Sequence, residues 1–526
     1  MVQPVSEMLR RRPVIRIDLN QAWWLGKQGC AAASRGTMVW AAPLIQINAD
    51  AGTLMGNALA RRCNFLANRS KRPDRRQNVG VTIGGNTIAC PDNGTRAGRG
   101  GHSQRSDTTR RGREGRAMSG PLAGIKVVEF SVAMAGPYAG MMLADYGAEV
   151  IKVERVGVGD DSRGWPPYFH DKVPHYFAAA NRNKLSVAID LKSPEGRDAA
   201  RDLVLSADVL LGNYRLEALP RAGLDYESLS AANPRLIYCL ISGFGATGPR
   251  RHEPANDLFM QAYTGGMSIT GEPDRAPSKM GLSVADIGAG MTATIGILMA
   301  LEARHRTGRG QRVDTSLLEG QMSMLSYHLT RYFATGVAPQ RAGSGGGVGV
   351  PYQAFRAADD YIVVAAFNPR MWRDFCGALD HPEWADDRRF HTAGARAENR
   401  DVLIGMIHDT MGRQPVKYWE ERLRAVSVPS TPVNNIDQIV MEEQVAARDM
   451  IVELDVPGAG PIKMAGLPLK FTETPGAVRL PPPRLGQHTE TVLLGLGYAA
   501  ETIRALAERG VIGLDTPYGQ APDGGR

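Results

Sequence analysis

The feature that most constrains the fold is a regular alternation, from residue 125 onward, of short β-branched segments with helical segments. Five segments are strand candidates: residues 125–130, 149–154, 185–189, 208–211 and 236–241. Helices are expected between them at residues 137–146 and 194–206, and each opens with a proline, which suits the first helical position. This order predicts an α/β fold with a parallel sheet covered by helices, and a ligand site beyond the carboxyl ends of the strands.

Residues 1–117 differ from the rest of the 526-residue chain in charge and patterning. They hold 20 of the 62 lysines and arginines but only 7 of the 54 aspartates and glutamates, whereas the remainder holds 42 basic and 47 acidic residues. Arginine clusters of this kind occur in tails that contact nucleic acid or membranes, and in targeting leaders. We interpret the segment instead as a disordered extension or a start codon assigned too early, because it lacks periodicity. The mildly acidic remainder gives no reason to expect nucleic-acid binding.

Cysteine and histidine spacings exclude several kinds of site. The five cysteines form no CxxC pair, which argues against a zinc knuckle or a thioredoxin-like motif and fits a reducing cytoplasm. HExxH, GxSxG and phosphate-loop motifs are absent, so we expect no metal and no serine hydrolase. The apolar stretch at residues 284–303 contains Asp286 and several glycines. It is predicted to be a buried core helix, running to His305, and not a membrane span.

Three segments have the composition of a ligand-binding edge. The small residues at 133–137 lie between a strand and a helix, where they form either an anion-binding helix start or a simple tight turn. The charges at 152–155 end the next strand, and charges in that position are usually solvated. The glycine run at 343–349 lacks the strand–turn–helix context of a dinucleotide fingerprint and is either a flexible linker or a mobile lid.

Asp286 is the strongest candidate for chemistry in the long apolar helix. Ser283 and Asp286 have the spacing of a capping box, and the helix dipole favours a carboxylate in the first turn, so a plain helix start explains them. An acid at a helix start beneath a ligand cleft is alternatively a nucleophile or a base. Asp274 is a nearby rival, but its Gly-Pro surroundings indicate an ordinary turn.

Taken in order, these segments resemble the family III CoA-transferases, the CaiB/BaiF family that includes formyl-CoA and carnitine CoA-transferases. The resemblance covers residues 118–513 and leaves the first 117 residues without a counterpart. The similar segments are residues 124–130, 135–137, 143–154, 181–184, 190–192, 242–245, 261–262, 267–271, 284–286 and 304–311. The resemblance implies a Rossmann-like large CoA-binding domain, a smaller α/β domain and an interlocked homodimer.

The resemblance also divides the chain. It implies a large domain at residues 118–330, a small domain with the glycine-rich loop at 331–439, a return to the large domain at 440–513 and a tail at 514–526. No permanently bound cofactor is implied, since coenzyme A or acyl-CoA is the substrate.

The same resemblance makes Asp286 the covalent nucleophile that carries CoA from an acyl-CoA to a carboxylic acid through mixed-anhydride and aspartyl-CoA intermediates. It implies that a glycine-rich lid, matched by Gly345, Gly346, Gly347 and Gly349, shields the anhydride from water. The CoA contacts that carry over are Met134, Ala135, Arg155, Ile189, Asp190, Leu191, Lys192, Asn213, Tyr214, Arg221, Gly243 and Phe244. Met134 and Ser242 replace a glutamine and a lysine of the formyl-CoA branch, which argues against formyl-CoA and oxalate as substrates.

The alternative interpretation is that the chain resembles the α-methylacyl-CoA racemases, which share this fold. They place an aspartate where Asp286 stands, so Asp286 does not separate the two activities. Their second proton-transfer residue, a histidine, is matched here by Asn256. An amide cannot act as an acid or base at neutral pH, so the sequence favours the transferase.

Overall fold

The computed structural model describes residues 81–83, 86–88, 120–346 and 349–518. Of the segment at 1–117, only the short antiparallel hairpin of β1 (Val81–Ile83) and β2 (Asn86–Ile88) is described, and it belongs to a separate unit that ends at residue 106. The expectation of a disordered extension otherwise lies outside the described residues. The same is true of residues 519–526 of the tail.

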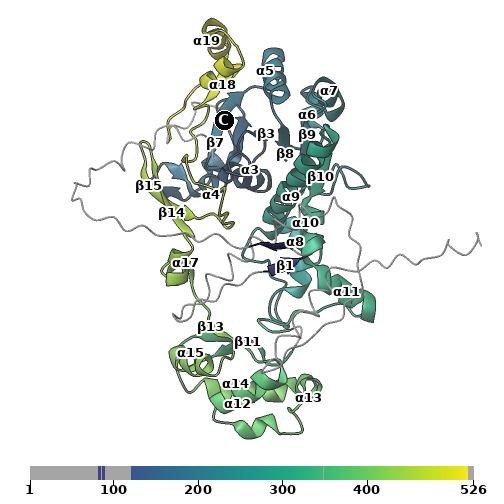
Figure 1. Cartoon of the computed structure of the whole chain (residues 1–526), viewed down its shortest axis with the longest axis vertical. Coiled ribbons are helices and arrows are strands. Elements are labelled where there is room, and N and C mark those ends of the chain that lie inside the picture. Colours follow the sequence, from purple (N-terminus) through teal and green to yellow (C-terminus); the bar gives the residue numbers. More distant parts are fainter. Residues whose placement is uncertain (1–80, 84–85, 89–119, 347–348, 519–526) are drawn as a thin grey trace, which may run out of the picture. The chain divides into compact units, whose positions relative to one another are not determined.

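A seven-stranded sheet forms the centre of the second unit (Figure 1). Its strands are β3 (Lys126–Phe130), β4 (Glu149–Glu154), β7 (Lys184–Ile189), β8 (Val209–Gly212), β9 (Ile237–Ser242), β10 (Arg312–Ser316) and β16 (Ile512–Gly513). They pair in the order β10-β9-β8-β3-β4-β7-β16, and only β16 runs antiparallel to its neighbour. The predicted α/β fold with a parallel sheet is therefore confirmed. The strand order reverses between β3 and β8, which makes that point the expected ligand crevice.

Both faces of the sheet are buried, because successive side chains of each strand point to opposite sides. Val128 and Phe130 of β3 pack on one face, with residues of α5 (Pro194–Leu205), α18 (Thr489–Gly495) and α19 (Ala500–Glu508). Val127 packs on the other face with α3 (Ala135–Asp145), α8 (Asp257–Tyr263), α9 (Val284–Thr307) and α10 (Leu317–Met324). Residues from both ends of the unit thus share one core.

Helix starts agree only in part with the sequence-based expectation. Helix α5 begins at Pro194, as predicted, and the hydroxyl of Ser193 accepts a hydrogen bond from the N–H of Gly196. Helix α3 begins two residues earlier than predicted, at Ala135. Pro137 is tolerated there because N–H groups in the first turn have no intrahelical partner. The earlier start brings the helix N-terminus closer to the end of β3.

Helix α9 is long and apolar enough to cross a membrane by length and composition alone. Half of that apolar window is buried inside the protein, where Ala285, Ala289, Ala293 and Ile297 pack against the sheet. The helix ends at Gly308, whose φ of 70° is the left-handed conformation typical of a helix stop. The other side of α9 carries exposed apolar residues.

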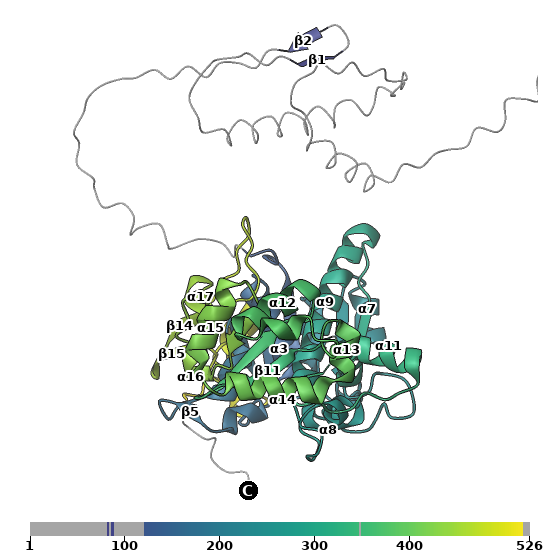
Figure 2. The ribbon, with the colours of Figure 1, turned by 90° about the horizontal axis from the view of Figure 1, so that it is seen from below.

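A smaller α/β unit follows the glycine run. Strands β11 (Tyr352–Arg356), β12 (Tyr361–Ala365) and β13 (Ser430–Pro432) form an antiparallel sheet. Figures 1 and 2 show α12 (Pro369–Ala378), α13 (Ala393–Glu398), α14 (Arg400–Met411) and α15 (Val416–Ala425) gathered around it. The hairpin of β14 (Ile451–Val456) and β15 (Gly460–Ala465) then leads back to α18, α19 and β16.

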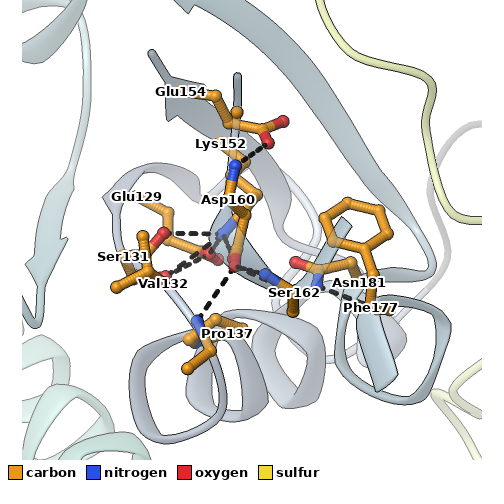
Figure 3. Close-up of polar contacts among 12 residues, drawn as sticks. Glu129, Ser131, Val132, Pro137, Lys152, Glu154, Asp160, Ser162, Phe177 and Asn181 are labelled. Atoms are coloured by element: carbon orange, nitrogen blue, oxygen red, sulfur yellow. Dashed lines mark hydrogen bonds and ion pairs between the residues drawn. The ribbon is translucent and has the colours of Figure 1, made fainter. Parts of the chain in front are cut away.

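Five charged side chains from β3, β4, β7 and the loop after β4 are buried together, and Lys152 lies at their centre (Figure 3). Its ammonium lies 3.1 Å from Glu129 Oε1 and 3.0 Å from Asp160 Oδ2, and it donates to Ser131 O at 2.8 Å. Lys184 contacts the other oxygen of Glu129 at 2.8 Å. The expectation that the charges at 152–155 are solvated is therefore wrong for Lys152, which is fully buried.

The cluster also includes an ion pair between Glu154 and Arg163. Glu154 pairs with Arg163 through both oxygens, each at 2.7 Å. Burial opposes ionisation of Glu129, but Lys184 and Lys152 outweigh it and hold the pKa of Glu129 below its ordinary value.

Gly140 of α3 has to be glycine, since a Cβ there would lie 1.8 Å from Glu129 Oε2. Helix α3 therefore crosses directly over the Glu129 carboxylate.

We predict that Glu129→Gln lowers the free energy of unfolding by about 3–5 kcal/mol, because two buried lysines lose their shared carboxylate. The matched control is Glu149→Gln on β4, whose pair with Lys126 spans 3.7 Å and is partly exposed. That change is expected to cost about 0–1 kcal/mol. Urea unfolding of the two variants measures the difference, and equal losses would contradict a structural role for the buried cluster.

Candidate active site

A cavity of about 500 Å³ opens at the point where the strand order reverses. It is lined by the loop after β3, by the residues after β8 and β9, and by the start of α9. The predicted site residues that line it are Met134, Ala135, Asn213, Tyr214, Gly243 and Asp286. Residues from positions 134 to 286 are thus brought together at one sheet edge.

The loop after β3 is held from two sides. The side chain of Asn213 accepts a hydrogen bond from the N–H of Val132 and donates one to its carbonyl oxygen, both at 2.9 Å. Asp160 Oδ1 accepts the N–H of Ala133 at 3.1 Å. Ala133 has a φ of 62°, a left-handed conformation that is unfavourable for a residue with a Cβ. The side-chain amide of Asn213 is therefore engaged by the loop, and the residue shapes the cavity by fixing the backbone.

Asp286 is the third residue of α9 and is partly buried. Burial, and then the negative charge of Asp257, raise the pKa of Asp286 to about 7. The capping box suggested by Ser283 and Asp286 is not formed, since Ser283 makes no side-chain cap. Asp257 accepts the N–H of Ala285 at 2.9 Å instead. The start of α9 therefore uses an acceptor from another helix, and the Asp286 side chain is left to face the cavity.

Two functional candidates were missed by the sequence analysis. Asp257 begins α8 and lies against the start of α9. Tyr176 belongs to α4 (His175–Asn181); its pKa is raised by burial first and then by the nearby Asp286 carboxylate. Tyr176 and Trp165 pack edge to face with ring centroids 4.9 Å apart. Tyr176 precedes Asp286 by more than a hundred residues, and no local motif indicates their proximity.

The predicted basic contacts lie along the same sheet edge but do not line the cavity of Asp286. Arg155 follows β4 and donates to Gly159 O at 3.0 Å, besides pairing with Asp161. Lys192 follows β7 and is exposed, and Arg221 ends α6 (Ala218–Arg221) and is also exposed. Arg155, Lys192 and Arg221 are therefore not among the residues that line the cavity of Asp286.

The other predicted contacts differ in exposure. Ile189 is fully buried in β7, and the Asp190 carboxylate accepts the N–H of Lys192 at 3.0 Å. Leu191 is partly buried, packed against the core. Phe244 is buried against Phe259 and Tyr263 and does not reach the cavity lining.

The glycine run lies apart from the cavity within its own chain. Gly347 lies outside the described residues, and none of Gly345, Gly346 and Gly349 lines the cavity. The N–H of Gly343 donates to Gly271 O at 3.0 Å. A Cβ at Gly345 would lie 2.6 Å from Arg400 Nη2, so this part of the run is packed closely against the smaller unit.

Asn256 lines the cavity together with Asp286. It is the N-cap of α8, where its side-chain oxygen accepts the N–H of Phe259 at 3.0 Å. Within the described ranges, no three histidine, cysteine, aspartate or glutamate side chains gather as metal ligands do.

The family model of CoA-transferase family III matches residues 122–489. The succinyl-CoA:glutarate CoA-transferase of Homo sapiens is 35% identical over 393 residues, which covers 74% of this chain and 90% of that protein. The succinate–glutarate CoA-transferase of Agrobacterium fabrum is 39% identical over 398 residues, covering 74% and 97%. The crystal structure of a CaiB/BaiF family protein from Brucella suis, 36% identical, aligns with a TM-score of 0.66 over 72% of this chain and all of that one.

These similarities confirm the resemblance drawn from the sequence motifs. The family model and the matched sequences give the transferase class, and the solved structure gives the same family and fold. The chain belongs to CoA-transferase family III, the CaiB/BaiF family, and is a CoA-transferase.

Proposed function

We propose that this chain moves CoA from an acyl-CoA to a free carboxylic acid, with Asp286 as the covalent nucleophile. The observation that carries the proposal is the position of Asp286. A partly buried carboxylate with a raised pKa faces a cavity at the switch point of the sheet. A group with these properties is a stronger nucleophile than a solvated carboxylate, and it sits where α/β enzymes bind their ligands.

The proposed reaction consists of four balanced steps. The Asp286 carboxylate attacks the thioester carbonyl, so that a C–O bond forms, the C–S bond breaks and CoA thiolate leaves. The thiolate attacks the aspartyl carbonyl of the mixed anhydride and releases the donor acid as a carboxylate. The acceptor carboxylate attacks the aspartyl-CoA thioester and again displaces the thiolate. The thiolate finally attacks the acceptor carbonyl, which forms the new acyl-CoA and regenerates Asp286.

The backbone at the start of α3 is placed to stabilise the oxyanions of these steps. Met134, the N-cap, and Ala135, the first helical residue, both line the cavity. Their N–H groups belong to the helix start, where no intrahelical acceptor exists. Because Asn213 and Asp160 hold the preceding residues, these donors are fixed before substrate arrives, which is the condition for effective oxyanion stabilisation.

Short dicarboxylic acids are the substrates we propose. The matched relatives include transferases named for succinyl-CoA with glutarate, mesaconate or D-citramalate, and one named for acetyl-CoA with oxalate. The cavity also contains Arg215, Arg251 and His252, which can receive a second carboxylate. A succinyl-CoA donor with a dicarboxylate acceptor fits this combination of one nucleophile and nearby cations.

The racemase alternative has little support from this geometry. Asn256 stands in the cavity where a second proton-transfer group is needed, and its side-chain oxygen is already used to cap α8. An amide neither donates nor accepts a proton at neutral pH. No observation on the described residues favours the racemase.

We also propose the interlocked homodimer that the family resemblance implies. Helix α9 exposes Met291, Ile295 and Met299, and α11 (Ser326–Thr335) has no buried residue although it carries Tyr327 and Phe333. Phe333 is 77% exposed and Met299 67% exposed. Exposed apolar faces of this kind indicate a surface that another chain covers.

The transferase proposal predicts that the protein converts succinyl-CoA and glutarate or mesaconate to the corresponding acyl-CoA, measured by chromatography of the CoA esters. Asp286→Ala should lower kcat by at least about 10³-fold, because no other carboxylate replaces the nucleophile. Asp274→Ala is the control, since Asp274 is exposed in a turn. An Asp286→Ala variant within about 10-fold of the wild type would rule out the covalent role.

The dimer proposal predicts a species of twice the chain mass in size-exclusion chromatography with light scattering. Phe333→Asp and Met299→Asp place a charge in the proposed interface and should increase the monomer fraction. A wild-type protein that stays monomeric at micromolar concentration would contradict the proposal.

A further inference from the structure

A carboxylate in the first turn of a long helix is ordinarily stabilised there. The free N–H groups and the helix dipole favour the anion and lower its pKa. Asp286 occupies such a position in the 24-residue helix α9, yet its pKa is raised to about 7. The start of α9 therefore differs from an ordinary helix start, and the contacts of α8 show how.

A second carboxylate takes the donors of this helix start. Asp257 Oδ1 accepts the N–H of Ala285 at 2.9 Å and lies 3.5 Å from the N–H of Asp286. These are the backbone groups that a first-turn anion or a capping side chain would otherwise use. Asp257 thus acts as the cap of α9 from outside the helix, while adding a negative charge beside Asp286.

The position of Asp257 is fixed by a buried glutamine. Gln261, one turn later on α8, donates to Asp257 Oδ2 at 2.7 Å and to Leu282 O at 3.1 Å. Its own oxygen accepts the N–H of Met280 at 2.8 Å. Gln261 is 1% exposed, so this clamp between α8 and the segment leading into α9 is shielded from water. Asp257 cannot turn away from Asp286 without breaking it.

The remaining charged groups near Asp286 do not offset Asp257. Tyr176 on α4 is neutral at physiological pH, because burial and then Asp286 raise its pKa. The cavity also holds Asp161, Arg215, Glu217, Arg251, His252 and Glu253. Arg251 donates to His252, and His252 contacts Glu217. Asp257 is the charged group that raises the pKa of Asp286 in addition to burial. Asp145 of α3 pairs with Arg182, and Glu319 of α10 accepts from Ser316.

We infer that Asp257 is a positioning residue for the transfer reaction: it occupies the N–H donors at the start of α9 and its charge keeps the Asp286 carboxylate poorly stabilised and reactive. This inference rests on the proposed nucleophilic role of Asp286. Asp257 itself touches no reacting atom, and its effect passes through the backbone and the electrostatic field at Asp286.

The test is the pH dependence of adduct formation in a single turnover, followed by mass spectrometry with succinyl-CoA as the probe. Asp286 reacts as the carboxylate, so the wild-type rate should fall as the pH drops through about 7.

In Asp257→Asn the like charge is lost and the helix start stabilises the anion. The acid limb should then move to lower pH by about one unit. The limiting rate at alkaline pH should fall by about 3-fold, because the nucleophilicity of an anion decreases with its basicity with a Brønsted slope of about 0.5.

Matched variants separate charge from structure. Gln261→Met breaks the same clamp without changing a charge, and Asp274→Asn removes a charge at an exposed turn. Asp274→Asn should keep the wild-type acid limb. Gln261→Met frees Asp257 to turn away from Asp286, so its acid limb should move to lower pH, by no more than that of Asp257→Asn. Asp257→Ser serves as the second charge-removing variant if Asp257→Asn is unstable in a thermal melt, since a hydroxyl can still accept the N–H of Ala285.

The outcomes are distinguishable. An adduct in the wild type with an unshifted acid limb in Asp257→Asn and Asp257→Ser overturns the inference and leaves the transferase mechanism intact. A shift of equal size in Asp274→Asn also overturns it, because the effect would then not depend on where the charge is lost. Absence of any adduct in the wild type contradicts the proposed nucleophilic role itself.

Discussion

The ion cluster around Lys152 is the constraint on which the rest of the site depends. A fully buried ammonium is stable only with close countercharges, and here Glu129 and Asp160 supply them at 3.1 and 3.0 Å. The same groups bond to the backbone: Lys152 to Ser131 O and Asp160 to the N–H of Ala133. The cluster therefore joins two neighbouring strands and sets the left-handed turn from which α3 and its free N–H groups begin.

Buried carboxylates of this protein fall into two electrostatic classes. Burial opposes ionisation of Glu129, Glu154 and Asp160, but lysine or arginine partners outweigh it and lower their pKa values. Asp286 has no such partner: burial and Asp257 act in the same direction and raise its pKa to about 7. The paired acids form the scaffold of the loop after β3, and the unpaired acid faces the cavity. The carboxylates that stabilise the fold and the carboxylate that is proposed to react are therefore different residues at the same edge of the sheet.

Much of the fold was predictable, because strands buried on both faces appear as β-branched runs and the helices between them begin at recognisable residues such as Ser193 and Pro194. Asp286 was identified through a family resemblance, since its local sequence equally fits a helix start. What sequence could not provide are contacts between distant segments. Asp257 caps α9 across 28 residues, and Lys152 looked like a solvated strand-end charge until the sheet placed Glu129 beside it. Ser283 failed as a cap for the same reason, because a tertiary acceptor replaced it.

Oxygen transfer to Asp286 is the most direct test of the account. In the proposed steps the acceptor carboxylate attacks the aspartyl carbonyl, so one acceptor oxygen remains on Asp286 when the new acyl-CoA leaves. Turnover with succinyl-CoA and an acceptor acid labelled with 18O in its carboxylates, followed by proteolysis and mass spectrometry, reports that oxygen. The account predicts 18O in the peptide that contains Asp286 and no label in other peptides. Formation of product with an unlabelled Asp286 peptide would contradict a covalent aspartyl intermediate.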